Sequence, residues 1–245
     1  KGFARKLLNS ININLLRRMK IEKWACGVNA GKWMWGNKFD VNNIIPNAIE
    51  EKKYKYNGKI REKIRKQCGF SEDDKVIGFV GRFGDEKNTF FLLDILKLLL
   101  EKSDKYKLLT VGGNGLYNEF VKKMQDMDLK KNFFSAGIQK NTSEWYQAMD
   151  AFLLPSFFEG FPVVAVEAQA SGLYCLLSNR ISKEVKLSNN TIFLPIENIK
   201  QWVEHIENMN LHDYNRRKDC IINRNYNIES AIKIVETKYE LLVKK

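Results

Sequence analysis

From residue 75 onward, short apolar runs alternate with longer amphipathic stretches. The apolar runs have the length of strands and predict buried ones at 75–81, 107–113, 133–137, 151–155, 174–178 and 191–195. The amphipathic stretches predict helices at 88–102, 116–127, 143–149 and 163–171. Apolar strands that alternate with helices are typical of a parallel sheet covered on both faces. We therefore predict an α/β fold with a doubly wound, Rossmann-like parallel sheet.

The two ends of the chain do not show this alternation of strands and helices. Two helical stretches, at about 3–20 and 28–35, precede VNNIIPNAIE (41–50), whose Asn-Pro-Asn sequence indicates a linker or a crossover. At the other end, residues 227–243 form the pattern of an amphipathic helix with Asn227 as its cap.

Composition narrows the class of protein. The chain has 245 residues, 44% of them apolar, which is enough for a packed core in a soluble globular protein. No apolar run approaches the roughly 18 residues of a membrane-spanning helix. The four cysteines are scattered without a C-x-x-C pair, which favours a reduced, cytosolic protein and argues against a zinc site.

The net charge of +12, from 41 basic and 29 acidic residues, favours anionic partners. Nucleic acid, phosphorylated substrates and an anionic membrane surface all fit, and a Lys- and Asn-rich composition from a biased genome explains the charge equally well. No aromatic-interleaved basic motif or helix-turn-helix pattern is present, which argues against nucleic acid.

Between 151 and 179 only two side chains are charged, Glu159 and Glu167, although the chain as a whole is 29% charged. At that frequency roughly eight charges are expected in a stretch of this length. A carboxylate in so apolar a segment is costly unless a partner satisfies it. The two glutamates flank a Gly-Phe-Pro turn, and we interpret them as a site for a polar ligand with hydroxyl groups.

Ligands of doubly wound sheets bind at the carboxyl ends of the strands. The loop GRFGDEKN (81–88) follows the first strand and places Arg82 and Lys87 beside a helix N-terminus, which predicts a diphosphate pocket. Ordinary loop charges remain the alternative. The loop VGGNG (111–115) lets backbone approach a ligand, although a tight turn without a ligand explains it as well. Neither a Walker A string nor a full G-x-G-x-x-G occurs here.

The segment SFFEGFP leads into the helix predicted at 163–171. Gly160 supplies flexibility, and Pro162 suits the first turn of a helix. The N–H groups of Phe161, Val163 and Val164 then face the crevice. Glu159 lies just outside the helix, where capping of backbone groups is an alternative role. Glu167 lies in the second turn, where that alternative is weaker because the N–H groups are already bonded.

Together these elements resemble the donor-binding half of the family 4 retaining glycosyltransferases, which have the GT-B fold. The matching text is VIGFVGRF…EKN, LLTVGGNG and MDAFLLPSFFEGFPVVAVEAQASG, with IIPNAIE as the interdomain linker. The resemblance is closest to the capsular and exopolysaccharide branch. ACGVNAGKWMWG (25–36) resembles the end of the family's N-terminal domain. The chain departs from the family at Ala48, where Gly is usual, and at Tyr174, where Pro is common.

The resemblance implies roles for the site residues. Arg82 and Lys87 hold the donor diphosphate and stabilise the leaving nucleotide, while Glu159 meets a hydroxyl of the transferred sugar. Glu167 binds the ribose, and Ile138 lies against the base. The remaining donor-binding positions are Gly81, Gly113, Gly160, Phe161, Pro162 and Val163. The donor is a UDP- or GDP-sugar, and no metal or other cofactor is implied.

The resemblance also implies a domain plan and a function. Residues 1–45 end an N-terminal acceptor domain and its linker, 46–215 bind the donor, and 216–245 form a C-terminal helical segment. We expect a hexosyltransferase-type enzyme of surface polysaccharide biosynthesis, truncated here to its donor-binding half with remnant helices of the N-terminal domain. A glycan or lipid-linked acceptor and a cytoplasmic location, peripheral at the inner face of the plasma membrane, complete the expectation. The alternative is a non-catalytic donor-binding or partner subunit of a split glycosyltransferase.

Overall fold

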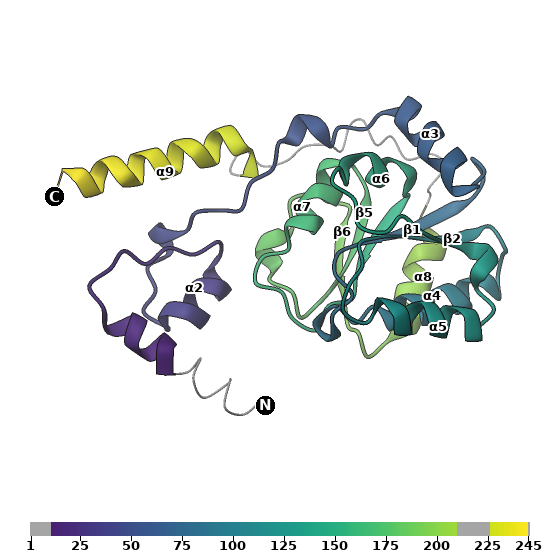
Figure 1. The fold of residues 1–245 in the computed structure, drawn as a ribbon, viewed down its shortest axis with the longest axis horizontal. Helices are drawn as coiled ribbons and strands as arrows, with labels where there is room; N and C mark the ends of the chain where they lie inside the picture. Colours follow the sequence, from purple (N-terminus) through teal and green to yellow (C-terminus); the bar gives the residue numbers. More distant parts are fainter. Residues whose placement is uncertain (1–10, 210–225, 245) are drawn as a thin grey trace.

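The computed structural model describes residues 11–209 and 226–244, and within them six parallel strands form one sheet (Figure 1). The strand order is β3-β2-β1-β4-β5-β6, so the chain winds outward in both directions from the centre of the sheet. The strands are β1 (Lys75–Val80), β2 (Tyr106–Val111), β3 (Phe133–Ser135), β4 (Ala151–Leu154), β5 (Tyr174–Ser178) and β6 (Thr191–Leu194). The predicted α/β doubly wound parallel sheet is confirmed.

Helices cover both faces of the sheet, as the sequence pattern predicts (Figure 1). One face carries α4 (Phe90–Leu100), α5 (Tyr117–Asp126) and α8 (Ile199–Asn208), and the other carries α3 (Gly58–Cys68), α6 (Ser143–Ala148) and α7 (Val163–Ala170). Short 3-10 turns are η1 (Val41–Asn43), η2 (Glu51–Lys53), η3 (Asp85–Lys87), η4 (Lys130–Asn132) and η5 (Lys183–Val185).

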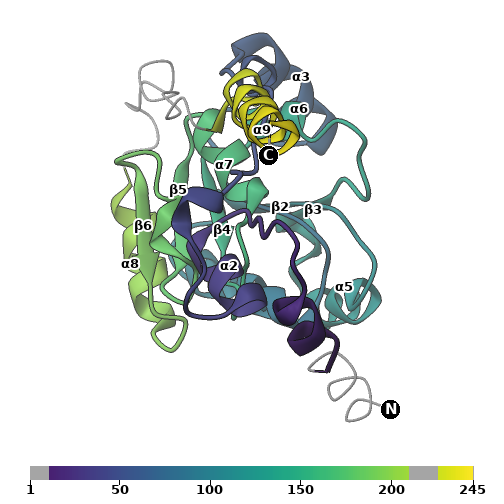
Figure 2. The same ribbon diagram turned by 90° about the vertical axis from the view of Figure 1, so that its left-hand side faces the viewer.

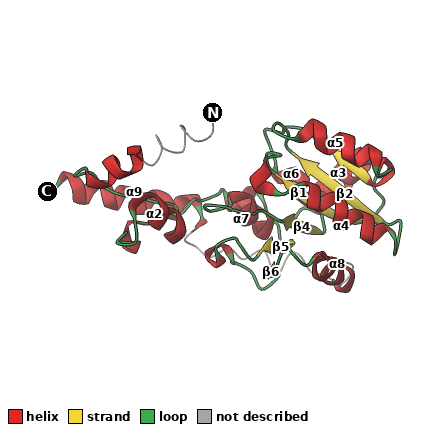
Figure 3. Cartoon of the chain, turned by 90° about the horizontal axis from the view of Figure 1, so that it is seen from below, coloured by secondary structure: helices red, strands yellow, loops and turns green. Residues whose placement is uncertain are grey.

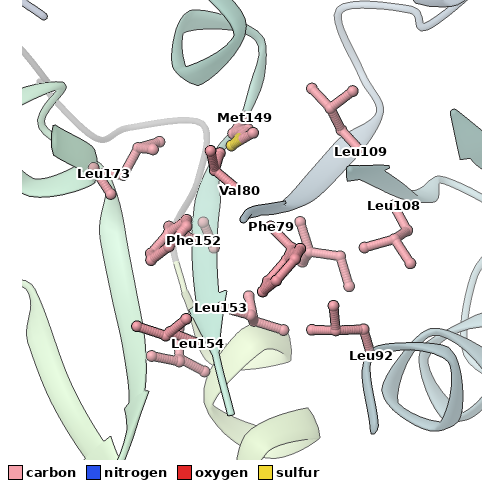
Figure 4. Packing of buried hydrophobic residues seen from close by; sticks show 14 of the residues in the cluster. Phe79, Val80, Leu92, Leu108, Leu109, Met149, Phe152, Leu153, Leu154 and Leu173 are labelled. Carbon is pink, nitrogen blue, oxygen red and sulfur yellow. The ribbon is translucent and has the colours of Figure 1, made fainter. Parts of the chain in front are cut away.

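The core lies between the sheet and these two helix layers (Figure 4). Phe79 of β1, Leu92 of α4 and Phe152 of β4 are fully buried. Removing each such side chain from water contributes about 1.5–3 kcal/mol, which explains why the central strands are apolar on both faces. The packing is close: a Cβ on Gly78 would lie 2.1 Å from the sulfur of Met149.

Local signals in the sequence set the helix ends. Asn57 caps α3 by accepting from the N–H groups of Lys59 and Ile60 at 3.0 and 3.2 Å. The same helix ends at Gly69, whose φ of 72° is left-handed and suits a residue without a Cβ. Two predicted ends shift slightly: β3 stops at Ser135 rather than at 137, and α7 ends at Ala170 rather than at 171. The predicted start of α7 at Val163 is confirmed, with Pro162 as the N-cap.

A buried ion cluster closes the edge of the sheet where β1 and β4 begin. Asp150 accepts from Arg61 at 2.7 Å and from Arg65 at 2.6 Å, and its second oxygen also accepts the N–H of Val76 at 2.8 Å. Arg65 is only 1% exposed, and its remaining N–H groups donate to the carbonyls of Ala148, Ser71, Glu72 and Asp74. We call Arg61, Arg65 and Asp150 the Asp150 clamp.

The segments at the two ends of the chain lie together, away from the sheet (Figures 1, 2 and 3). They contain α2 (Val28–Trp35) and α9 (Ile228–Val243), and residues 11–18 are also helical. The Trp24 and Tyr239 rings meet edge-on with centroids 5.3 Å apart, and Lys238 donates to the Asn42 carbonyl at 2.6 Å. The C-terminal helix is therefore held by the N-terminal segment. Of the helix predicted at 3–20, residues 1–10 lie outside the described ranges.

The predicted cap of α9 is present, since the Asn227 side chain accepts the N–H of Glu229 at 2.8 Å. Within 11–209 and 226–244, no helix is both long and apolar enough to cross a membrane. Within the described residues Cys26, Cys68 and Cys175 form no disulfide, and Cys220 lies outside these residues.

Candidate functional site

The loops that follow β1, β2, β3 and β4 meet at the carboxyl edge of the sheet and are tied to one another. Phe83 and Gly115 form a parallel bridge, and Gly112 donates to the Gly137 carbonyl at 2.8 Å. Phe157 donates to the Glu86 carbonyl at 2.8 Å, which joins the loop after β4 to the loop after β1. The segments that the sequence singled out therefore form one continuous surface.

Gly112 allows two of these loops to touch. A Cβ at this position would lie 1.9 Å from the carbonyl oxygen of Gly81, and the φ of 128° is one that other residues rarely adopt. Gly81 and Gly112 thus meet backbone to backbone. The sequence motif VGGNG is explained by this contact as well as by approach to a ligand.

A hollow of about 350 Å³ lies beside this contact. Its walls come from residues 112–115, from Tyr117 and Asn118 at the start of α5, and from Gly137 and Ile138 after β3. Two predicted site residues, Gly113 and Ile138, therefore line the same hollow. Ile138 is 69% exposed, so its side chain offers an apolar surface to a ligand rather than packing into the core.

Arg82 and Lys87 pair with different carboxylates. Arg82 is exposed and donates to Glu86 at 2.6 Å, and this contact holds the pKa of the Glu86 carboxyl below its ordinary value. Lys87 pairs with Glu159, 2.6 Å from Nζ to Oε1. The two cations predicted for the diphosphate therefore differ in environment: Arg82 faces solvent, and Lys87 is tied to a carboxylate of the loop after β4.

The Lys87–Glu159 pair is largely shielded from water, with side chains 17% and 11% exposed. The hydroxyl of Ser156, which is fully buried, donates to the same Glu159 oxygen at 2.7 Å. These two partners compensate the burial of Glu159. Burial alone therefore does not require a ligand at Glu159, contrary to our interpretation of the charge-poor segment.

The N-terminus of α7 lies directly after Glu159 and Gly160. No side chain caps the helix, and within the described residues the N–H groups of Val163 and Val164 have no protein acceptor. The ring of Phe161 is 8% exposed and stacks on Tyr226, with centroids 5.4 Å apart, so only its backbone is available to a ligand. A Cβ on Gly160 would meet no atom within 4 Å, which leaves this stretch of backbone open. Such a helix start attracts anions.

Glu167 projects from the second turn of α7 and is held by two tyrosines. Tyr54 donates to Oε1 and Tyr146 donates to Oε2, each at 2.8 Å. Burial raises the pKa of the Glu167 carboxyl, and the two hydroxyls lower it in part. As with the Lys87 partner of Glu159, both hydroxyl partners of Glu167 come from other segments of the chain.

Sequence reasoning missed four residues of this edge. Tyr54 and Tyr146 lie outside the matching sequence motifs, and nothing in SFFEGFP singles out Ser156 within it; each of the three binds a glutamate through its hydroxyl. Arg180 could have been found, since it follows the strand predicted at 174–178. Its guanidinium lies over the Phe157 ring, 5.7 Å from the centroid, and adds a third cation to this edge.

The arrangement brings cations, an open helix N-terminus, carboxylates and a hollow with an apolar rim to one edge of the sheet. Cations and N–H groups bind phosphate oxygens, carboxylates accept hydrogen bonds from hydroxyls, and an apolar rim packs against a flat ring. Among the described residues, no three His, Cys, Asp or Glu side chains come together in a way that could hold a metal ion.

Comparison with known proteins identifies a family. Residues 60–225 match the model of "Glycosyl transferases group 1". EpsF of Bacillus subtilis (strain 168) is 32% identical over 187 residues, which cover 74% of this chain and 49% of EpsF. An Escherichia coli relative, "UDP-Gal:alpha-D-GlcNAc-diphosphoundecaprenol alpha-1,3-galactosyltransferase", is 32% identical over 143 residues, 56% of this chain and 36% of that protein. The chain thus spans about half or less of the length of these relatives.

Solved structures share the fold. Anabaena Alr3699/HepE in complex with UDP-glucose superposes with a TM-score of 0.79 at 17% identity, covering 96% of this chain and 67% of that one. WaaG, a glycosyltransferase involved in lipopolysaccharide biosynthesis, superposes with a TM-score of 0.72 at 18% identity, covering 86% of this chain and 62% of that one.

Proposed function

This chain belongs to the group 1 glycosyl transferase family, and we propose that it carries the nucleotide-sugar site of a hexosyltransferase of surface polysaccharide biosynthesis. The observation that carries the proposal is the grouping at the carboxyl edge of the sheet. There the Lys87–Glu159 pair, the open start of α7 and Glu167 follow one another along a single surface. Cations for a diphosphate thus stand next to carboxylates for hydroxyls.

The diphosphate lies against the N-terminus of α7, between Lys87 and the exposed guanidinium of Arg82. Both cations reach it by sharing or leaving their present carboxylate partners, Glu159 and Glu86. They stabilise the negative charge that develops on the leaving nucleotide as the glycosidic bond breaks. Glu159, relieved of part of its contact with Lys87, accepts a hydrogen bond from the transferred sugar.

The nucleoside lies on the other side of the diphosphate. Glu167 accepts from the ribose hydroxyls, and the base packs on Ile138 beside the hollow that Gly113 lines. Gly81 and Gly160 supply backbone that a ligand can approach, and Phe161, Pro162 and Val163 contribute the main chain at the start of α7. A UDP-sugar is the donor that we favour over a GDP-sugar, because the E. coli relative is named for UDP-Gal and the HepE structure contains UDP-glucose.

We propose a retaining transfer in which the donor phosphate accepts the proton of the acceptor hydroxyl and the new bond keeps the anomeric configuration of the donor. The acceptor is a glycan or a lipid-linked sugar, as the name of the E. coli relative indicates for that enzyme. The net charge of +12 supports contact with an anionic membrane surface, because each basic residue near such a surface contributes about 1 kcal/mol.

The domain plan is proposed on the contacts between segments. Residues 46–215 form the donor-binding unit, and 1–45 and 216–245 belong with an acceptor-binding part. Contacts between the two end segments support this plan, since the Trp24 and Tyr239 rings meet edge-on with centroids 5.3 Å apart and Lys238 donates to the Asn42 carbonyl at 2.6 Å.

Isothermal titration of UDP, GDP and their glucose and galactose conjugates into the 245-residue chain tests the site. We expect UDP-sugar binding that Arg82→Ala and Glu167→Ala each weaken by about tenfold or more. Lys105→Ala is the matched control, because Lys105 is also exposed and paired, with Asp73, but lies at the opposite edge of the sheet. Binding that both site variants leave unchanged would remove the basis of the proposal.

A further inference from the structure

The Glu167 carboxylate is the centre of a cluster that joins three separate elements. Tyr54 comes from the chain between η2 and α3, Tyr146 from α6, and Glu167 from α7. Each hydroxyl donates to a different carboxylate oxygen at 2.8 Å, and the two rings meet edge-on with centroids 6.0 Å apart. The carboxylate is thus fixed from two sides.

The position of Tyr54 is itself held by other contacts. Gln147 of α6, which is 1% exposed, donates to the Tyr54 carbonyl at 3.2 Å and accepts the N–H of Asn57 at 3.0 Å. The buried amide therefore fastens the backbone at Tyr54 and at Asn57 to α6. A hydroxyl held in this way orients its acceptor more firmly than a free surface side chain does.

The partners of Glu167 differ in kind from those of Asp150. Asp150 is bound by two guanidinium groups and one N–H, which neutralise its charge. Glu167 has two hydroxyl donors, which orient the carboxylate without cancelling its charge. A carboxylate has about four acceptor positions, so one remains on each oxygen. Two acceptors on one carboxylate match two adjacent hydroxyls on one ring.

Building on the proposed donor site, we propose that Tyr54 and Tyr146 are positioning residues that aim the Glu167 carboxylate at the 2′- and 3′-hydroxyls of the nucleotide. They do not touch the reacting atoms. Through Glu167 they set how strongly the site prefers a ribonucleotide to a nucleotide that lacks these hydroxyls.

The charge state of Glu167 supports this role. Burial raises the pKa of its carboxyl and both tyrosine hydroxyls lower it, so removal of either hydroxyl makes protonation easier. A protonated carboxyl loses acceptor capacity. The other titratable groups that act on the two tyrosines are Glu50, ahead of η2, and Cys175 of β5.

The test compares two probes in each protein. UDP and 2′,3′-dideoxy-UDP are titrated into the wild-type chain, Tyr54→Phe and Glu167→Gln, and the ratio of their dissociation constants is recorded. We expect the wild type to prefer UDP by about tenfold or more, because hydrogen bonds to a charged group are among the stronger ones. Tyr54→Phe should reduce this ratio by about threefold or more, and Glu167→Gln should bring it close to one.

Tyr106→Phe is the matched control, because it removes a hydroxyl from a tyrosine at the opposite edge of the sheet. It should leave the ratio unchanged. A purely structural role of Tyr54 would weaken both probes equally and would also leave the ratio unchanged. Tyr146→Phe is a second variant, with its fold checked by thermal unfolding because Tyr146 is fully buried.

The outcomes separate the two proposals. A wild-type ratio that Tyr54→Phe and Tyr146→Phe both preserve would overturn the positioning role while UDP binding upholds the donor site. A ratio that survives Glu167→Gln would place the ribose elsewhere and would overturn the positioning role as well. A wild-type chain that binds neither UDP nor GDP would overturn the donor site and, with it, this inference. The proposal also requires a shift in the pH dependence of UDP-glucose binding. As the pH is lowered, Tyr54→Phe should lose binding at a higher pH than the wild type, because its Glu167 is protonated more easily.

Discussion

The two edges of the sheet both hold buried carboxylates, but the carboxylates are satisfied in different ways. At the edge where the strands begin, two guanidinium groups and a backbone N–H bind Asp150. The other N–H groups of Arg65 donate to backbone carbonyls. At the edge where they end, Glu159 has one lysine and one hydroxyl, and Glu167 has two hydroxyls.

The difference separates structural charge from charge that is available to a ligand. In the Asp150 clamp two guanidinium groups neutralise the carboxylate and a backbone N–H binds it as well, so its role is to hold β1, β4 and α3 together. The carboxyl edge keeps capacity on both glutamates, on the exposed Arg82 and on the N–H groups of α7. A buried carboxylate is therefore weak evidence for a binding site until its partners have been counted.

The largest expected effect comes from breaking the Asp150 clamp. Asp150→Asn leaves Arg65, 1% exposed, without its counter-charge, and removal of one partner of a buried pair costs about 3–5 kcal/mol. We expect that loss in the free energy of unfolding, measured by urea denaturation. Nucleotide affinity of the protein that remains folded should not change. A loss of affinity without a loss of stability would contradict the division between the two edges.

Lys87→Met should have the opposite effect to Asp150→Asn, because it should change the affinity for nucleotide more than the free energy of unfolding. Loss of a largely shielded cation from the proposed diphosphate site is expected to weaken UDP binding by about a hundredfold, or about 2.7 kcal/mol. Lys107→Met is the matched control, because Lys107 is 16% exposed and pairs with an 11% exposed Asp74 at the other edge. Equal effects of the two variants on UDP affinity, measured by calorimetry, would show that Lys87 has no special role.

Gly112→Ala should disturb the carboxyl edge through its backbone. The new Cβ would lie 1.9 Å from the Gly81 carbonyl oxygen at a φ of 128°, and such strain costs about 1–3 kcal/mol of stability. Gly160→Ala is the comparison, since a Cβ there meets no atom within 4 Å. Urea denaturation of both variants measures the difference, and equal stability of the two would show that the loops after β1 and β2 can separate freely.

The smallest expected effect is a pH dependence of donor affinity that originates at Glu167. Burial raises the pKa of this carboxyl, so as the pH falls the folded protein takes up a proton at Glu167 before the unfolded chain does. The contribution of Glu167 to stability is thus present below the ordinary pKa of glutamate and is lost as the pH rises through the raised value. Donor affinity should instead increase as the pH rises, because the ionised carboxylate is the better hydrogen-bond acceptor.

Titration of UDP-glucose at a series of pH values measures this effect, which we expect to reach about tenfold. UDP-glucose is preferred to UDP because UDP has a terminal phosphate whose second pKa of about 6 would add its own pH dependence. Glu167→Gln is the control and should lose this part of the profile. An unchanged profile in Glu167→Gln would assign the pH dependence to another group.

Most of the fold could be predicted from the sequence because both faces of the central strands are buried. The runs at 75–81 and 174–178 are nearly continuous in apolar residues, and the structure places β1 and β5 within one residue of them. The order of the strands could not be read in this way. Apolar strands resemble one another, and nothing in YCLLS or TIFLP states which neighbour each strand pairs with.

Part of the candidate site could be predicted, because several of its residues lie at or just after the ends of predicted strands. Arg82, Lys87, Gly113, Ile138 and Glu159 all lie in segments that directly follow apolar runs, and the structure brings these segments to one edge. The direction of each side chain was not predictable. Arg82 and Lys87 are five positions apart in one loop, yet they pair with different carboxylates.

The sequence by itself determined the alternation of strands and helices, the family and the short list of charged residues at the strand ends, because these depend on local pattern and spacing. Only the tertiary structure decided which groups satisfy the two glutamates. Tyr54 lies 113 positions before Glu167, and Lys87 lies 72 positions before Glu159. Contacts over such separations form when the sheet assembles, and no local pattern encodes them.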